Sequence, residues 1–267
     1  MIVPGQFALH YDTMPSHKAD WLEAGMPVII TEKLHGSNCA VGKPLVYERL
    51  AWWKRALNMV GFKFKPTTTR KMIYSSKNVI KNDDPDKVNR HFYNEDIWAE
   101  ALEPILQRQD EWHAGVTLYG EIVGVSKNGT PVQSTKGKAY DYSKLLDGRT
   151  IGFIAFRMTF TDVNGKVTEM FRSELESYCN GLNIPTVPIA ECSNVSENVS
   201  EWLKEIRNKY AIGDCLYCNN KVLREGVVIT YEHCPSDRFK PDTNKVCKLK
   251  SAEFLGMETE ILDESKI

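Results

Sequence analysis

The residue best suited to chemistry in this chain is a lysine that ends an apolar run. Pro27-Val28-Ile29-Ile30 leads into Thr31-Glu32-Lys33-Leu34-His35-Gly36-Ser37-Asn38, so Lys33 comes at the end of a predicted strand. A lysine amine held there, with a turn behind it, is placed to attack an electrophile. Lys-x-x-Gly is common on its own, so other segments must support this interpretation.

Five further segments with chemically active side chains follow Lys33 in a fixed order. They are Ser75-Ser76-Lys77-Asn78, Tyr119-Gly120-Glu121-Ile122-Val123-Gly124, Phe153-Ile154-Ala155-Phe156, Arg224-Glu225-Gly226-Val227-Val228-Ile229 and Lys248-Leu249-Lys250. Lysine and arginine side chains bind phosphates, and carboxylate side chains bind divalent metal ions. Each segment is weak evidence alone, and the specificity lies in their order.

The elements that must position these residues are mostly strands. Strands are predicted over 28–33, 116–125, 150–162, 166–171, 227–231 and 246–249, with Asn164-Gly165 as a hairpin turn. Helices are predicted over 48–59, over 94–109 with a break near Pro104, from Ser173 through Cys179 behind a Ser173/Glu176 capping box, and over 196–210. Strands outnumber simple βαβ units, which predicts an α+β fold of antiparallel sheets with helices outside them.

The bulk composition is that of an ordinary soluble protein. The 267 residues carry a net charge of −1 and are 42% hydrophobic and 26% charged. No apolar run approaches the roughly 18–20 residues that span a bilayer, and the N-terminus lacks a secretory signal. Seven irregularly spaced cysteines are typical of a reduced, intracellular chain. We therefore expect a cytoplasmic protein with no membrane partner, of phage or bacterial origin from its compactness.

Positive charge is concentrated in residues 48–71. The cations there are Arg49, Lys54, Arg55, Lys63, Lys65, Arg70 and Lys71, against the single acid Glu48, and the aromatic residues are Trp52, Trp53, Phe62 and Phe64. Cations neutralise phosphates and aromatic rings stack on bases, so the segment is a candidate nucleic-acid contact through Arg49, Lys54, Arg55, Lys63 and Lys65. The alternative is a structural insert that Trp52 and Trp53 anchor to the body.

Together, the ordered segments resemble the covalent nucleotidyltransferases, which include ATP-dependent ligases and mRNA capping enzymes. Lys-x-His-Gly followed by Ser-Asn is most similar to the phage RNA ligase 2-like family of ATP-dependent RNA ligases, and the resemblance spans residues 28–250. It implies one nucleotidyltransferase domain. This is an ATP-grasp-like ligase catalytic domain whose ATP pocket lies between antiparallel sheets. The implied activity joins 3′-hydroxyl and 5′-phosphate RNA ends at duplex nicks, through a lysyl-AMP intermediate and an AMP-capped 5′ end.

The resemblance also implies a role for each motif residue. Lys33 would be the nucleophile, Lys248 and Lys250 would grip the phosphates, and Glu225 and Glu121 would hold Mg²⁺ or Mn²⁺, directly or through water. The residues expected to contact the nucleotide are Glu32, Lys33, Leu34, Gly36, Asn38, Lys77, Glu121, Phe156, Glu225, Lys248 and Lys250.

Physical chemistry gives a reason for three of these expected nucleotide contacts. The Glu32 carboxylate would accept a hydrogen bond from the adenine amine. Gly36 would let the chain turn close to the ribose and phosphate. Phe156 would stack on adenine, with Phe153 as the fallback, because residues three apart on a strand face opposite sides.

A lysine nucleophile needs help from its surroundings. At a reference pKa of about 10.4 the amine is protonated near neutrality. Nearby cations and a divalent metal ion disfavour the ammonium form, which is the effect expected of Lys248, Lys250 and Mg²⁺. The same charges would neutralise the α-phosphate as the reaction proceeds.

The sequence departs from the family pattern in two places. Arg157 follows Phe156 where an aspartate is usual, and residues 48–71 lengthen the gap between Lys33 and Lys77. Only 17 residues follow Lys250, so we expect one catalytic domain over 1–267 and no C-terminal OB or other accessory domain. We also expect a monomer.

Several alternatives remain open. A minimal ligase for DNA or mixed RNA/DNA nicks would share these motifs, and a degenerate module would bind nucleotide or nucleic-acid ends without catalysis. A capping enzyme would use GTP, which Glu32 disfavours because its carboxylate would face the guanine O6 acceptor.

Two further features of the sequence have open interpretations. His35 either tunes the site or is a turn residue. Cys215-Leu216-Tyr217-Cys218, with Cys234 and Cys247 as partners, supplies only one paired cluster where zinc sites usually need two.

Overall fold

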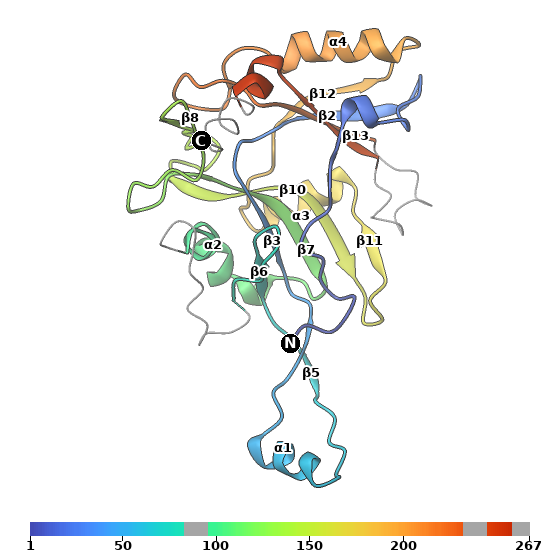
Figure 1. Cartoon of the computed structure of the whole chain (residues 1–267), viewed down its shortest axis with the longest axis vertical. Helices are drawn as coiled ribbons and strands as arrows, with labels where there is room; N and C mark the ends of the chain where they lie inside the picture. The colour runs from blue at the N-terminus through green and yellow to red at the C-terminus, as the bar shows by residue number, and fades with distance from the viewer. Residues whose placement is uncertain (83–95, 232–244, 258–267) are drawn as a thin grey trace, which may run out of the picture.

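Two five-stranded sheets form the body of the protein in the computed structural model, which describes residues 1–82, 96–231 and 245–257 (Figure 1). Sheet 1 comprises, in spatial order, β1 (Met14–Pro15), β14 (Val246–Lys250), β13 (Gly226–Tyr231), β2 (Pro27–Glu32) and β12 (Ile189–Asn194). Sheet 2 comprises β11 (Val167–Glu169), β10 (Ile151–Thr161), β7 (Val116–Gly124), β3 (Ser37–Gly42) and β6 (Ile73–Ser75). Within the described sheets β1 and β14 are parallel and the other neighbours are antiparallel. The predicted α+β class is confirmed.

Three helices cover the sheets from outside. The helices α2 (Ile97–Gln107) and α3 (Arg172–Gly181) pack against β10, and α4 (Val199–Tyr210) packs against β13. Each sheet thus has its own apolar core, with Trp98 and Leu102 of α2 buried on sheet 2 and Trp202 and Ile206 of α4 buried on sheet 1. Across the described ranges, no helix has the length and apolar character that a membrane span requires.

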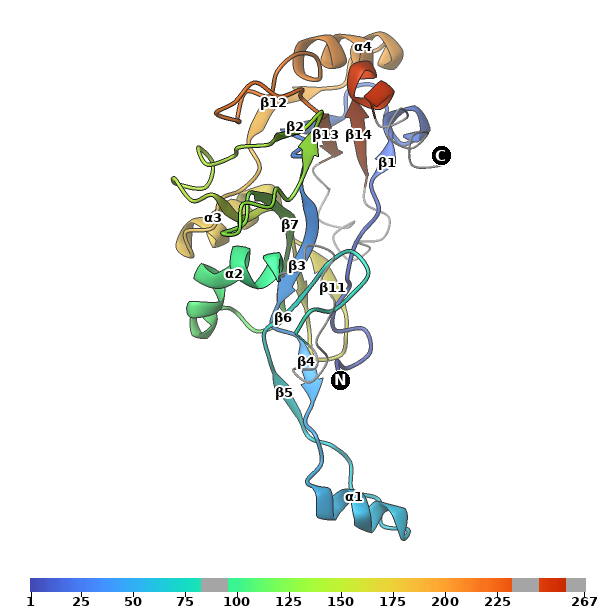
Figure 2. The same ribbon diagram turned by 60° about the vertical axis from the view of Figure 1, so that its left-hand side comes forward.

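The remaining elements are short. The single-turn 3₁₀ helices are η1 (Ser16–Lys18) and η2 (Gln109–Glu111). One two-stranded ladder pairs β8 (Ser134–Thr135) with β9 (Lys138–Ala139), and another pairs β4 (Leu45–Tyr47) with β5 (Thr68–Arg70). The helix α1 (Trp52–Met59) lies across the far end of the β4–β5 arm, away from the body (Figures 1 and 2).

The register of sheet 1 brings distant motif segments together. Gly226 on β13 pairs with Lys250 on β14, and the Lys33 N–H donates to the Gly226 carbonyl at 2.9 Å. Gly226 has φ of +147°, and a Cβ atom there would lie 2.2 Å from the Leu249 carbonyl oxygen, so only glycine permits this approach. As a result Lys33, Glu225 and Lys250 emerge together at one edge of the sheet.

The predicted break at Pro104 is wrong. The helix α2 continues through Pro104 to Gln107, because the burial of Trp98 and Leu102 against sheet 2 outweighs the backbone hydrogen bond that proline cannot make. The predicted beginning of this helix at residue 94 lies outside the described residues.

Two other helix starts also differ from prediction. The helix α3 begins at Arg172, because the Glu174 carboxylate accepts a 2.7 Å hydrogen bond from the Phe171 N–H, so the Ser173/Glu176 box is wrong. The helix α1 begins at Trp52 rather than at residue 48, because the backbone N–H of Glu48 donates to Thr67 across the end of the β4–β5 ladder.

Candidate active site

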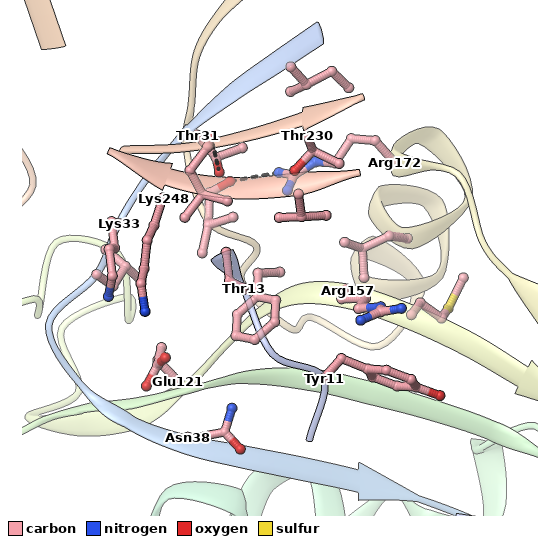
Figure 3. A pocket seen from close by; sticks show the side chains of 18 of the residues that line it. Tyr11, Thr13, Thr31, Lys33, Asn38, Glu121, Arg157, Arg172, Thr230 and Lys248 are labelled. Atoms are coloured by element: carbon pink, nitrogen blue, oxygen red, sulfur yellow. Dashed lines mark hydrogen bonds between the residues drawn. The ribbon is translucent and has the colours of Figure 1, made fainter. Parts of the chain in front are cut away.

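A cavity of about 560 Å³ lies between the two sheets. Its walls carry side chains of β2, β13 and β14 from sheet 1 and of β3, β7 and β10 from sheet 2. Figure 3 shows Lys33 and Lys248 side by side, with Glu121 and Asn38 across from them. The predicted nucleotide contacts that line this cavity are Glu32, Lys33, Leu34, Asn38, Lys77, Glu121, Phe156 and Lys248.

The Glu225 carboxylate holds the Lys33 side chain in position. Its Oε1 atom lies 2.8 Å from Lys33 Nζ and 3.1 Å from Lys250 Nζ, and its Oε2 atom lies 3.1 Å from His35 Nδ1. The side chain is only 4% exposed. Burial alone would raise the pKa of Glu225, but Lys33, His35 and Lys250 together hold that pKa at about 2. The carboxylate is therefore ionised near neutral pH.

Lys248 extends from β14 into the cavity beside Lys33 (Figure 3). Burial lowers the pKa of Lys248, and the charges of Lys33 and Lys250 lower it further. Lys250 reaches Glu225 instead of the cavity wall, and its Nζ lies 5.1 Å from the centre of the Phe254 ring. The three lysines form a cationic cluster suited to an anion such as a phosphate.

Glu121 and Asn38 face the lysines from sheet 2. Within the described part of the chain, Glu121 Oε2 and Asn38 Oδ1 are buried and have no hydrogen-bond partner. Unsatisfied buried oxygens are costly, and their presence in a cavity indicates a missing ligand or ion. Burial raises the pKa of Glu121 to about 7, while Lys33 opposes this rise and Glu225 adds to it.

The oxygens of Glu225, Glu121 and Asn38 fit a hard divalent cation. Mg²⁺ and Mn²⁺ prefer carboxylate, carbonyl and water oxygens. No group of three or more His, Cys, Asp or Glu side chains in the described ranges is arranged to hold a metal ion by itself. The fit is therefore to an ion bound by one or two carboxylates and completed by substrate phosphates and water, which is the usual way that Mg²⁺ binds.

The structure distinguishes the two candidate stacking residues. The strand β10 has a register shift between Ala155 and Arg157, and Phe156 is the extra residue of this bulge. Phe156 lines the cavity, whereas Phe153 is 1% exposed and lies in the core of sheet 2. Phe156 thus lies at the cavity and Phe153 does not, and stacking of Phe156 on adenine stays a prediction.

Arg157, where the family pattern has an aspartate, forms part of the cavity wall. Its guanidinium makes hydrogen bonds of 2.8–3.0 Å to the Glu169 carboxylate and lies 3.7 Å from the centre of the Tyr11 ring. The ion pair and the cation–π contact together fix the N-terminal segment against sheet 2 (Figure 3).

Glu32 does not present a free carboxylate to a base. The buried Arg224 guanidinium binds both carboxylate oxygens, at 2.9 Å from Nε to each and through Nη2 as well. Burial raises the pKa of Glu32 to about 7, and Arg224 opposes that rise. The predicted contact with the adenine amine is therefore not supported, and the argument against guanine that depended on it no longer holds. Glu32 instead anchors the end of β2, directly before Lys33.

Gly36 is needed for packing rather than for a turn near the nucleotide. A Cβ atom at Gly36 would lie 2.5 Å from the Ile122 carbonyl oxygen and 2.8 Å from Val123 Cγ1. Gly36 does not line the cavity. The close contact with β7 brings the Lys33 segment down onto sheet 2, which corrects the predicted reason for this glycine.

Several cavity residues were not predicted from the sequence. The N-terminal segment contributes His10, Tyr11, Asp12 and Thr13, and sheet 1 contributes Thr31, Val228 and Thr230. Lys77, which was predicted, lies 3.6 Å from Asp12 at the exposed edge of the cavity. Arg172 at the start of α3 donates a 2.6 Å hydrogen bond to the Val187 carbonyl (Figure 3). Only the alternation of β13 could have indicated Val228 and Thr230 beforehand.

The cysteines do not support the zinc alternative within the described residues. Cys215 and Cys218 are both buried in the cluster behind Leu34, whereas Cys247 lies in the separate core of sheet 1. Cys215 Sγ is 3.9 Å from Glu32 Oε1, so this cysteine packs behind the ion pair with Arg224. Cys234 lies outside the described residues.

The fold and the lysine-centred cavity define a nucleotidyltransferase-type protein. The chain belongs to the RNA ligase family, whose profile matches residues 26–250. A search of curated protein sequences finds no match.

Solved structures of Naegleria gruberi RNA ligase share the fold. A lysine-to-alanine variant with ATP and Mn is 18% identical, with a TM-score of 0.52 over 96% of this chain and 59% of that chain. The ligase with PPi is 18% identical, with a TM-score of 0.54 over 97% and 60%. A glutamate-to-alanine variant with AMP and Mn is 17% identical, with a TM-score of 0.52 over 96% and 59%. The present chain therefore spans about 60% of the length of those ligases.

Glu121→Gln is expected to stabilise the protein above neutral pH. With its pKa raised to about 7, the folded protein retains a proton that the unfolded chain loses from about pH 4.5, so stability falls as pH rises between these values. Glutamine cannot ionise, so the variant avoids this loss of stability, which is on the order of 1–3 kcal/mol. Thermal melts at pH 5 and pH 8 should show a larger gain for the variant at pH 8. The exposed control Glu253→Gln should give no pH-dependent difference, and an equal gain for Glu121→Gln at both pH values would contradict the burial argument.

Glu225→Gln is expected to destabilise the protein strongly at pH 7. The variant leaves Lys33, His35 and Lys250 without their anion, at a cost of about 3–5 kcal/mol for a broken buried pair. Because the folded pKa is about 2, this contribution is present above the unfolded value of 4.5 and fades as pH falls toward 2. Urea unfolding at pH 7 and pH 3 should therefore show a smaller difference from wild type at pH 3. An undiminished difference at pH 3 would be inconsistent with an ionic role.

Proposed function

We propose that this protein is an ATP-dependent RNA ligase that joins 3′-hydroxyl and 5′-phosphate ends through a lysyl-AMP intermediate. The observation that carries the proposal is the Lys33 amine, which is held by Glu225 and faces unsatisfied oxygens of Glu121 and Asn38 across the cavity. Membership of the RNA ligase family supports the reaction type. The ATP and Mn of the Naegleria gruberi ligase structures support the choice of nucleotide and metal.

In the first step the Lys33 nitrogen bonds to the α-phosphorus of ATP and pyrophosphate leaves. Paired with Glu225, the Lys33 ammonium has no lone pair to donate, so nucleotide binding must loosen this pair and release one proton to solvent before the attack. The nitrogen loses a second proton, to solvent or to the departing pyrophosphate, as the N–P bond forms. Lys248, beside Lys33, would bind the phosphates and disfavour a second positive charge next to it. When bound, Mg²⁺ or Mn²⁺ held by Glu225 and Glu121, directly or through water, would neutralise charge at the α-phosphate.

In the later steps AMP passes from Lys33 to the 5′-phosphate of one nucleic-acid end. The 3′-hydroxyl oxygen of the other end then attacks that phosphate, a phosphodiester bond forms and AMP leaves. Phe156 and Val228, on opposite sheets of the cavity, are placed to enclose the base, and Lys77 and Asn38 to contact phosphate or ribose. We propose nicked duplex RNA as the substrate, with DNA-containing nicks as the alternative that the assay below compares.

Lys33→Ala is expected to abolish ATP-dependent sealing of a nicked RNA duplex, because no amine remains to accept AMP. The same variant should still seal a nick whose 5′-phosphate already carries AMP, since that step needs the cavity but not the nucleophile. Product formation on labelled strands, with RNA and DNA nicks in parallel and GTP beside ATP, would measure both. Lys138→Ala, an exposed lysine on β9, is the control and should seal like wild type.

Two results would contradict the proposal. Wild-type protein that seals neither RNA nor DNA with ATP and Mg²⁺ would indicate a binding module without catalysis. ATP-dependent sealing that persists in Lys33→Ala would mean that another residue is the nucleophile. Restored sealing of the AMP-capped nick shows that the variant is folded, so loss of fold cannot imitate the expected result.

A further inference from the structure

Residues 45–70 form an arm that leaves the body at the end of sheet 2 that is remote from sheet 1 (Figures 1 and 2). The arm comprises β4, α1 and β5, and Figures 1 and 2 both show it extending from the end of the molecule opposite α4. It is inserted between two cavity residues, because β3 carries Asn38 on one side and β6 leads to Lys77 on the other. The arm is therefore attached to the site through two strands of sheet 2.

The outer part of the arm, beyond the β4–β5 stem, is exposed. No residue of α1 is buried, and Trp52 is 80% exposed. Met59 and Phe62 are 88% and 57% exposed. A tryptophan with this exposure does not anchor an insert to the body, so the anchoring role considered from the sequence is wrong for Trp52. Large exposed apolar groups of this kind usually mark an interaction surface.

The arm is nevertheless a defined structure. Asn58 at the end of α1 closes its tip, because its Oδ1 accepts from the Phe64 N–H at 2.7 Å and its Nδ2 donates to the Phe64 carbonyl at 3.0 Å. The Trp53 and Phe64 rings meet edge to face at 6.0 Å, with Lys54 Nζ 5.3 Å from the centre of the Trp53 ring. A preorganised tip loses little conformational entropy when it binds a partner.

The charge of the arm is almost entirely positive. Arg55, Lys63 and Lys65 are exposed on the tip and its return strand, and the single acid, Glu48, accepts a hydrogen bond from the Thr67 hydroxyl at the stem. Cations gathered around exposed aromatic rings match a polyanion that has flat rings, which is the chemistry of a nucleic acid.

We propose that the arm binds the phosphate backbone of the substrate RNA at a distance from the ends that are joined. This inference rests on the proposed ligase function, and it adds where the enzyme holds its substrate. Tyr47 at the base of the arm lies about nine residues beyond Asn38 along β3 and β4, which at roughly 3.3 Å per residue gives at most about 30 Å. The cations of the tip lie beyond this base, so the arm would contact RNA about one helical turn or more away from the join.

The double variant Arg55→Ala/Lys65→Ala tests this placement by binding of a nicked RNA duplex across a salt series. Removing one cation that binds a phosphate should reduce the slope of log K against log salt by about one. The double variant should therefore reduce the slope by about two and bind on the order of tenfold more weakly at low salt. The control Lys138→Ala/Lys204→Ala removes two exposed lysines of the body and should leave the slope unchanged.

Flank length gives the second measurement. When the duplex on one side of the nick is shortened below about ten base pairs, wild type should lose affinity and the difference from Arg55→Ala/Lys65→Ala should disappear. Equal salt slopes for wild type and variant would overturn the inference. So would a wild-type dimer that the variant converts to monomer, because the arm would then be an interface between copies of the chain.

Formation of the protein–AMP adduct separates this inference from the proposed function. Adduct formation needs no nucleic acid, so both double variants should be labelled by ATP like wild type, which also shows that they are folded. Absence of label on wild type would refute the ligase proposal itself. Normal label with unchanged RNA affinity of the arm variant would refute only the placement of the RNA.

Discussion

The buried carboxylate of Glu225 is the constraint on which the site depends. A negative charge that is 4% exposed needs cations around it, and Lys33, Lys250 and His35 supply them. These contacts hold the Lys33 amine, which lines the cavity, at the end of β2.

The charged cluster around Glu225 is assembled from segments that are far apart in the chain, so it depends on how the strands of sheet 1 pair. His35 and Glu225 are 190 residues apart in the chain, and only the antiparallel register of β2, β13 and β14 brings them to one edge. Gly226 allows β13 to approach β14, and Gly36 allows the Lys33 segment to reach β7 on the second sheet. The cavity is therefore the space between two sheets, and the segment from β2 through Lys33 to β3 is one of the connections between them.

The excess of strand patterns predicted the fold class, and the family resemblance carried by the order of the motifs implied many of the cavity residues, among them Lys33, Glu121 and Lys248. Sequence reasoning failed where a tertiary contact decides the outcome. The bulge that directs Phe156 into the cavity and the Arg224 guanidinium that binds Glu32 leave no local pattern. Pro104 indicated a helix break, yet burial of α2 overrides it. The N-terminal cavity wall around Tyr11 follows from its stacking with Arg157, which no spacing could show.

The most direct test of this account is to locate the adduct on the protein. Wild-type protein, first freed of bound AMP, would be incubated with ATP and Mg²⁺, digested at a pH that preserves a phosphoramidate, and mapped by peptide mass spectrometry. The account predicts AMP on the peptide that contains Lys33 and on no peptide that contains Lys248 or Lys250. AMP on either of the other two lysines, or no adduct on any peptide, would contradict it.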